Sequence, residues 1–203
     1  MSGAPLLRRI TPADHLIMPW KNGLGFTREI AIDPKDASMS DAGFRWRLSI
    51  ATVDQSGPFS SFPGIDRTIM VIDGNGMELT VAGQAPHLLD RCFVPFSFPG
   101  DAATECKLID GPIRDFNLMV NRKLLAARCE TQEIEEPAEV RIQRAIFIAH
   151  VLAGEIAVSF GDATVNCGAG DTAIADASGA SAALQLNPAL KSVAAVMQLA
   201  PVR

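Results

Sequence analysis

The sequence predicts an all-β protein with little helix, and two observations support this fold class. Thirteen prolines and sixteen glycines interrupt the 203 residues every few positions, and long apolar stripes of helical period are absent. Between these interruptions lie short runs rich in β-branched and aromatic residues, bounded by Gly, Pro and Asp. Many short strands at close spacing are typical of a β-sandwich or a β-barrel.

The expected strands fall into two groups. In the first half they are Thr27–Ile32, Phe44–Val53, Thr68–Ile72, Met77–Val81, Thr104–Ile109 and Phe116–Val120. In the second half they are Ala145–Leu152, Glu155–Phe160, Ala163–Cys167, Thr172–Ala175, Ala182–Leu186 and Ser192–Leu199. Short helices are expected at Thr11–His15, where Pro12 would occupy the first helical position, and at the polar connection Arg122–Arg128.

The two halves share a pattern of turns. A strand ends at Gly74 or Gly154, a polar-tipped hairpin follows, and a Gly-Asp turn (Gly100-Asp101 or Gly170-Asp171) opens another strand. The acidic stretch Glu130–Glu139 lies between the halves and is a candidate linker. These features predict two duplicated β-modules, residues 1–128 and 129–203.

This pattern resembles the cupins, small jelly-roll-type β-barrels with such glycine landmarks. Two units in one chain would make a bicupin, that is, two jelly-roll-type β-barrel modules. The resemblance implies a barrel whose cavity is lined by side chains and opens at one end.

Composition excludes several classes of function. A net charge of -5 disfavours nucleic acid as a partner, because binding phosphates needs a basic surface. No apolar run is long enough to span a bilayer, and the N-terminus lacks the pattern of a signal peptide. The four cysteines form no CxxC pair, which favours free thiols in a reducing compartment. We therefore expect a cytoplasmic protein with no membrane partner.

Neither a metal site nor a catalytic centre is predicted. The three histidines, His15, His87 and His150, are far apart in the sequence and lack the His-x-His pair of metal-dependent cupins. No G-x-S-x-G elbow, phosphate-binding loop or activated cysteine is recognisable. We expect no cofactor and assign no catalytic residue.

The segment Met18–Glu29 combines an aromatic residue, an amide, cations, a hydroxyl and two glycines. Either it is a turn that opens an edge strand, or it forms one wall of a ligand site. In the second case the binding side chains would be Trp20, Lys21, Asn22 and Thr27.

Two predicted strands carry polar residues in alternation with apolar ones. In Phe44–Val53 the residues Arg45 and Arg47 share a face, which either faces solvent or lines a cavity that holds an anion. In the second strand Asp115 and Asn117 share a face, and if buried they need hydrogen-bond partners, from the protein or from a ligand. Phe62, in the turn-rich loop before Arg67, is a candidate pocket wall.

Taken together, these segments resemble the HutD/Ves family of small bacterial bicupins. The segments that carry the resemblance are Met18–Glu29, Phe44–Phe62, Pro63–Arg67, Phe98–Asp101 and Asp110–Met119. The chain departs from the family pattern at Leu24, where a glycine is usual. The resemblance implies a metal-free pocket in the first module. It also implies regulation of histidine utilisation through a small acidic intermediate such as formylglutamate or urocanate, but it supplies no catalytic residue.

The leading hypothesis is a binding protein for a carboxylated metabolite. Arg45 and Arg47 would pair with the carboxylate, the polar residues Asn22, Thr27 and Asn117 would read neighbouring groups, and Trp20 and Phe62 would close over the apolar part.

Two alternatives stay open. One is a metal-independent isomerase, lyase or hydrolase that acts on a small acidic metabolite with Asp115 or Glu29 as general base. The other is a protein-interaction role for the Trp20 loop. Because jelly-roll edge strands must be covered, we also expect a homodimer.

Overall fold

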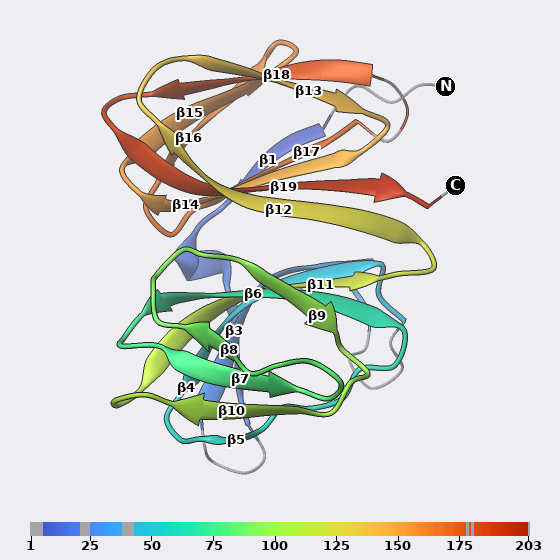
Figure 1. Ribbon diagram of the computed structural model, residues 1–203. Helices are drawn as coiled ribbons and strands as arrows, with labels where there is room; N and C mark the ends of the chain where they lie inside the picture. Colours follow the sequence, from blue (N-terminus) through green and yellow to red (C-terminus); the bar gives the residue numbers. More distant parts are fainter. Residues whose placement is uncertain (1–5, 21–24, 38–42, 178, 180, 203) are drawn as a thin grey trace. The chain divides into compact units, whose positions relative to one another are not determined.

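The computed structural model describes residues 6–20, 25–37, 43–177, 179 and 181–202, and almost all of its regular structure is strand (Figure 1). Among these residues the helical element is one 3-10 turn, Pro12–Asp14. The all-β prediction is confirmed. The chain divides into two compact units, which we call the first module (His15–Leu125) and the second module (residues up to Asp14 and from Ala126 onward).

The division differs in one respect from the expected modules 1–128 and 129–203. Strand β1 (Leu6–Ile10) pairs along its whole length with β17 (Thr172–Asp176), so the N-terminal strand is part of the second module. Pairing partners far apart in sequence leave no local signature, and the β1 segment therefore gave no indication of where it belongs.

The first module consists of two antiparallel sheets that form two layers in Figure 1. The six-stranded sheet has the order β2 (Leu16–Pro19), β3 (Gly25–Asp33), β4 (Trp46–Val53), β11 (Ile113–Asn121), β6 (Ile65–Asp73), β9 (Phe96–Pro99). The four-stranded sheet has the order β5 (Gly57–Pro58), β10 (Thr104–Leu108), β7 (Met77–Val81), β8 (His87–Leu89).

The core of the first module lies between these two sheets. Ala51, Val53 and Ile69 from the six-stranded sheet pack with Met77 and Leu79 from the four-stranded sheet. Since side chains alternate between the faces of a strand, every second residue of β4, β6 and β11 faces this core. The functional question is which polar residues share that inner face.

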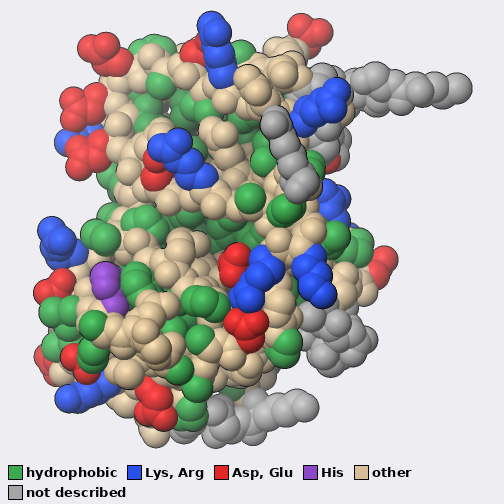
Figure 2. Space-filling model, turned by 45° about the vertical axis from the view of Figure 1, so that its right-hand side comes forward, with side chains coloured by type: hydrophobic (Ala, Val, Ile, Leu, Met, Phe, Trp, Pro, Cys, Tyr) green, Lys and Arg blue, Asp and Glu red, His purple; other side chains and the backbone are tan. Residues whose placement is uncertain are grey.

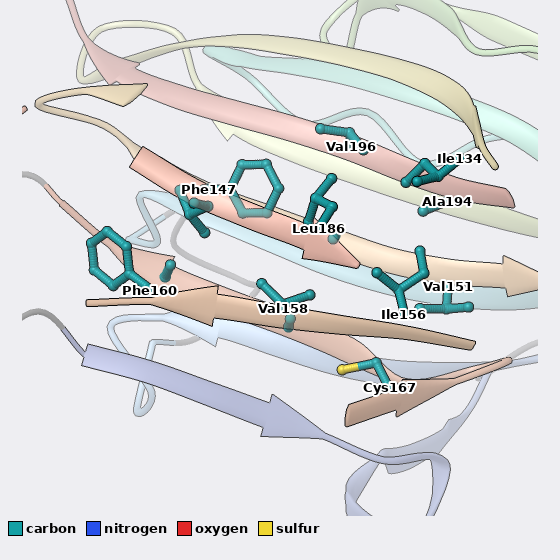
Figure 3. Close-up of a cluster of buried hydrophobic side chains, with 14 of the residues drawn as sticks. Ile134, Phe147, Val151, Ile156, Val158, Phe160, Cys167, Leu186, Ala194 and Val196 are labelled. Atoms are coloured by element: carbon teal, nitrogen blue, oxygen red, sulfur yellow. The ribbon is translucent and has the colours of Figure 1, made fainter. Parts of the chain in front are cut away.

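The second module repeats the two-sheet design. One sheet has the order β1, β17, β14 (Ile146–Ala153), β19 (Ser192–Pro201), β12 (Leu125–Ile134); the other has the order β13 (Ala138–Gln143), β18 (Ser181–Pro188), β15 (Glu155–Phe160), β16 (Ala163–Gly168). Figure 3 shows its core, where Phe147, Phe160, Val158 and Leu186 from facing strands meet. The residues of this cluster carry no charged side chain, unlike the inner face of the first module.

Three local predictions have different outcomes. The helix expected at Thr11–His15 is the 3-10 turn, in which the Asp14 carboxylate accepts hydrogen bonds from the Thr11 backbone N–H and hydroxyl. The helix expected at Arg122–Arg128 is wrong, because a turn at Asn121–Leu124 leads directly into β12. The acidic linker Glu130–Glu139 is also wrong, because its residues belong mostly to β12 and β13.

The described residues include no helix that is long and apolar enough to cross a membrane. On the face shown in Figure 2, acidic and basic side chains neighbour each other with apolar ones between them. The described part of this face therefore presents no extended field of one sign that would suit a nucleic-acid backbone.

Candidate functional site

The inner face of the first module carries a buried polar cluster, formed by neighbouring strands of the six-stranded sheet. In the register of β11 with β4 and β6, Asn117 lies opposite Ser49 and Ile69, and Met119 lies opposite Arg47 and Arg67. Asp115 and Asn117 therefore face the same side as these two arginines. All four polar residues are at least nine-tenths buried.

Arg67 is the most isolated cation of the cluster. Its guanidinium carbon lies 5.0, 5.7 and 5.1 Å from the ring centroids of Phe59, Phe62 and Phe98, within the range of cation–π attraction. Its Nε has no hydrogen-bond partner among the described residues. Burial lowers the pKa of Arg67 to about 10, with Asp115 opposing the shift and Arg47 adding to it. The side chain is a desolvated cation held by aromatic rings.

Asp115 is almost fully buried, and its Oδ1 has no hydrogen-bond partner among the described residues. Burial raises the pKa of this carboxyl to about 7, and the attraction of Arg67 offsets only part of that shift. The neighbouring Oδ1 of Asn117 also lacks a partner there. Two acceptors and one donor of the cluster are thus buried and unused, which is uncommon in a folded interior.

Arg47 differs from Arg67 because the protein itself neutralises it. Its Nε donates to the Glu29 carboxylate at 2.6 Å, and both side chains are largely buried, with exposed fractions of 6% and 13%. Its Nη1 donates to the Ser49 hydroxyl at 3.3 Å and lies 3.9 Å from the Met119 sulfur. The Arg47–Glu29 pair therefore supports the wall of the cluster.

Trp20 and Thr27 form a second contact at the edge of the same sheet. The indole Nε1 of Trp20 donates to the Thr27 hydroxyl at 2.8 Å, and the ring packs against the core of the first module. A side chain at Gly25 would collide with the backbone oxygen of Thr52 and crowd the Trp20 ring. Glycine at this position therefore lets β3 and the indole approach each other.

The structure brings together some of the predicted site residues and separates others. Arg47, Asp115 and Asn117 share the inner face, and Phe62 contacts the cluster through Arg67; Trp20 and Thr27 lie on the same sheet. Arg45 lies outside the cluster, 42% exposed, and pairs with Asp33 at 3.1 Å at the start of β4. Lys21 and Asn22 lie outside the described residues.

Sequence reasoning missed Arg67, the central cation, because the segment 57–67 reads as a turn-rich loop. The strand β6 in fact begins at Ile65. The signal that could have found Arg67 is the alternation Ile65, Arg67, Ile69, Val71, which places the arginine among residues that face the core.

The described residues include no group of three or more His, Cys, Asp or Glu that could hold a metal ion. The titratable side chains of the cluster are Arg47, Arg67 and Asp115, and an arginine cannot ligate a cation. The arrangement combines a desolvated cation, aromatic rings and unused polar atoms, a chemistry that suits an anion.

Comparison with known proteins gives one family. The family model named HutD matches residues 12–194. An uncharacterised 21.2 kDa protein in the hutC 3′ region of Pseudomonas putida is 45% identical over 130 residues, which are 64% of this chain and 65% of that protein. The protein Ves of Cronobacter sakazakii is 38% identical over 56% of this chain and 58% of its own length. These alignments thus span less than two thirds of the curated relatives.

Solved structures extend the likeness over nearly the whole chain. A conserved protein of unknown function from Pseudomonas aeruginosa PAO1 has a TM-score of 0.86 at 33% identity, covering 98% of this chain and 100% of that one. HutD from Pseudomonas fluorescens SBW25, in a formate condition, has a TM-score of 0.82 at 33% identity with the same coverage.

A variant of Bacillus subtilis oxalate decarboxylase has a TM-score of 0.67 at 8% identity, covering 94% of this chain and 76% of that one, and shows the cupin fold alone. The resemblance found in the sequence is thereby confirmed. The chain belongs to the HutD family of cupin-fold proteins.

Proposed function

We propose that the first module binds a small carboxylated metabolite in the polar cluster around Arg67. The observation that carries this proposal is the buried guanidinium of Arg67, which has aromatic rings around it and an Nε without a partner among the described residues. A guanidinium fork matches a carboxylate in geometry and charge. An anion supplied from outside would give this cation the hydrogen bonds that the chain does not provide.

The choice of Arg67 revises the expected roles of Arg45 and Arg47. Each of those arginines is paired with a carboxylate of the chain itself, Asp33 and Glu29 respectively. Among the described residues no carboxylate lies within ion-pair distance of Arg67, which interacts with Asp115 only over a longer range. Arg67 is therefore the cation that we assign to the ligand, while Arg47 holds the wall.

The other side chains suit a ligand with further polar groups. Asp115 is partly protonated near neutral pH, since its pKa is about 7, and its O–H can donate to a ligand oxygen. Asn117 offers an unused oxygen to a ligand N–H. Phe59 and Phe62 would cover the apolar part, with Trp20 and Thr27 further along the sheet, while Lys21 and Asn22 stay predictions.

The family and its relatives suggest a biological setting. The Pseudomonas putida relative is named for the hutC region, so we place the protein in histidine utilisation, as a cytoplasmic regulator or buffer of an acidic intermediate. Formylglutamate and urocanate are the candidates. We further propose a homodimer formed through strand edges, to be checked by sedimentation.

Isothermal titration with formylglutamate and with urocanate tests the binding proposal. Replacing Arg67 with Gln should weaken binding by about 2–4 kcal/mol, because the ligand loses its charged partner. Asn117→Ala provides a second, smaller change that leaves the cation in place. Arg114→Ala is the matched control, because Arg114 lies on β11 with Asn117, next to the strand of Arg67, and its side chain is 53% exposed. Equal affinity in Arg67→Gln and the control would rule out this site.

A second candidate function is proton-transfer catalysis with Asp115 as general base. A neighbouring arginine lowers the pKa of a carboxyl, but the burial of Asp115 outweighs the attraction of Arg67. A pKa of about 7 suits a base at neutral pH, and no protein donor occupies Oδ1 among the described residues. Glu29 is less suitable, because Arg47 binds its carboxylate.

The two candidates separate in one experiment. Deuterium exchange or chemical conversion of either metabolite, followed by NMR, should occur with the native protein and be lost in Asp115→Asn if the base is used. If the native protein binds the metabolite but neither exchanges nor converts it over hours, the binding function stands and the catalytic one is excluded.

A further inference from the structure

The second module has a cavity of its own, separate from the cluster of the first module. It has a volume of about 340 Å³, within the range of small-molecule sites. It lies beside β15 and β16, and its polar lining consists of Arg9, Glu155, Asn166, Gly168, Asp171 and Asn187. All of these residues belong to the second module.

The floor of this cavity is a row across three strands. Ala157 on β15 lies opposite Asn166 on β16 and opposite Asn187 on β18, so two amides flank one methyl group. Neither amide has a hydrogen-bond partner among the described residues. Because the residue between them is small, both amides remain free to reach a bound molecule.

Charged groups of both signs line the cavity beside this row: Glu155 on β15, Asp171 in the turn between β16 and β17, and Arg9 on β1. Glu155 lies opposite Gly168, and its carboxylate forms no ion pair within the described chain. Asp171 is buried and accepts from the Gly168 N–H at 2.8 Å and from Arg9 at 2.7 and 3.0 Å. The Arg9 guanidinium is thereby fixed in place, while 44% of its side chain stays exposed.

Gly168 keeps the space between these charges open. A β-carbon at this position would meet only the Asp171 carboxylate, at 3.9 Å, so glycine is not required there by packing. Its pairing with Glu155 on β15 and the inward position of Cys167 place any added side chain on the cavity side. Glycine here leaves room for a ligand.

We propose that this cavity is a second ligand site, and that it takes a free α-amino acid. Glu155 and the two asparagine oxygens would accept hydrogen bonds from the ammonium group, and the exposed edge of Arg9 would bind the carboxylate. Arg9 and Asp171 neutralise each other, so the site carries the single negative charge of Glu155. This balance selects a molecule with an ammonium group over a simple anion.

NMR titration of the 15N-labelled full chain with the common L-amino acids, one at a time, tests the proposal. At least one should shift the side-chain amide signals of Asn166 and Asn187 together with the Gly168 amide. Its N-acetyl and its carboxamide derivatives should each bind about tenfold more weakly or worse, because each lacks one charge. If no amino acid shifts these amide signals at a concentration of about 10 mM, the assignment is overturned.

Two variants locate the site. Gly168→Leu should abolish binding by filling the cavity, and Glu155→Gln should weaken it about tenfold through loss of the charge. Arg141→Gln on β13 is the control, since its side chain is 85% exposed and outside the cavity. Arg67→Gln in the first module should also leave this binding unchanged. Equal binding in folded Gly168→Leu and in the control would contradict the proposal.

Discussion

Arg67 and Asp115 lie on the neighbouring strands β6 and β11, and both are buried on the same face without forming an ion pair with each other. Arg67 on β6 lies opposite Met119 on β11. On the same face of β11, Asn117 lies between Met119 and Asp115. The two charged groups thus flank a buried amide. Each shifts the pKa of the other, yet burial remains the larger cause for both. The burial of Asp115 beside Arg67 makes both stability and ligand affinity depend on pH.

The free energy of unfolding should depend on pH through Asp115. Its pKa is about 7 in the folded chain and near 3.8 when exposed, so the unfolded state releases the proton first as pH rises. The contribution of Asp115 to stability is therefore greatest below pH about 4, falls up to pH about 7 and then levels off, for a loss of about 4 kcal/mol. Urea unfolding at a series of pH values measures this curve.

The variant Asp115→Asn should flatten that part of the curve, because it removes the titrating group. Asp90→Asn, at an exposed position of the same module, should leave the curve unchanged. An identical slope for native protein and Asp115→Asn would show that another group is responsible.

Ligand affinity should also depend on pH through Asp115, and it should fall as the pH rises above the pKa of this carboxyl. A protonated Asp115 donates to the ligand, whereas an ionised Asp115 repels its carboxylate, so affinity should fall by about tenfold per pH unit above pH 7. Titration calorimetry of formylglutamate between pH 6 and pH 9, a range that includes the Asp115 pKa of about 7, gives the slope. Asp115→Asn should bind with an affinity that no longer varies with pH, and a persistent slope would remove Asp115 from the site.

The strands of this fold were predictable, because alternation and turn residues are local signals. Each expected strand from Thr27–Ile32 to Ser192–Leu199 corresponds to an observed one, although boundaries move by a few residues. The strands that were missed are β1, β2, β5, β8, β9, β12 and β13. In β1 and β12, polar residues such as Arg8 and Glu130 hide the alternation. Their pairing within the second module supplies the stability that local propensity lacks.

The candidate site was predictable only in part. Asp115 and Asn117 were found because polar side chains on an apolar strand must form hydrogen bonds, with the protein or with a ligand, if they are buried. The equal treatment of Arg45 and Arg47 was wrong at the start of β4, since the strand begins at Trp46 and Arg45 pairs with Asp33 instead. Which arginine stays without a carboxylate depends on the register between strands, and no single strand reveals it.

Replacing Arg47 should lower the free energy of unfolding, and it should change ligand affinity only indirectly. Arg47→Ala leaves the Glu29 carboxylate buried without its 2.6 Å partner, so we expect a loss of about 3–5 kcal/mol. The exposed pair Arg114–Asp73 is the control, and Arg114→Ala should cost less than about 1 kcal/mol. Chemical denaturation measures both. A loss in Arg47→Ala no greater than in the control would mean that the pair does not stabilise the wall.

Gly25 should not tolerate replacement by a residue with a side chain, and such a replacement should also disturb the position of the Trp20 ring. At φ +153° a β-carbon would collide with the Thr52 backbone oxygen and lie 3.2 Å from the indole ring. Gly25→Ala should therefore destabilise the first module by about 1–3 kcal/mol. It should also shift the tryptophan fluorescence, since the hydrogen bond of Trp20 to Thr27 depends on this approach. Gly57→Ala is the matched control, because nothing lies within 4 Å of its added carbon. If both variants unfold at the same urea concentration with unchanged fluorescence, Gly25 does not hold the Trp20 contact in place.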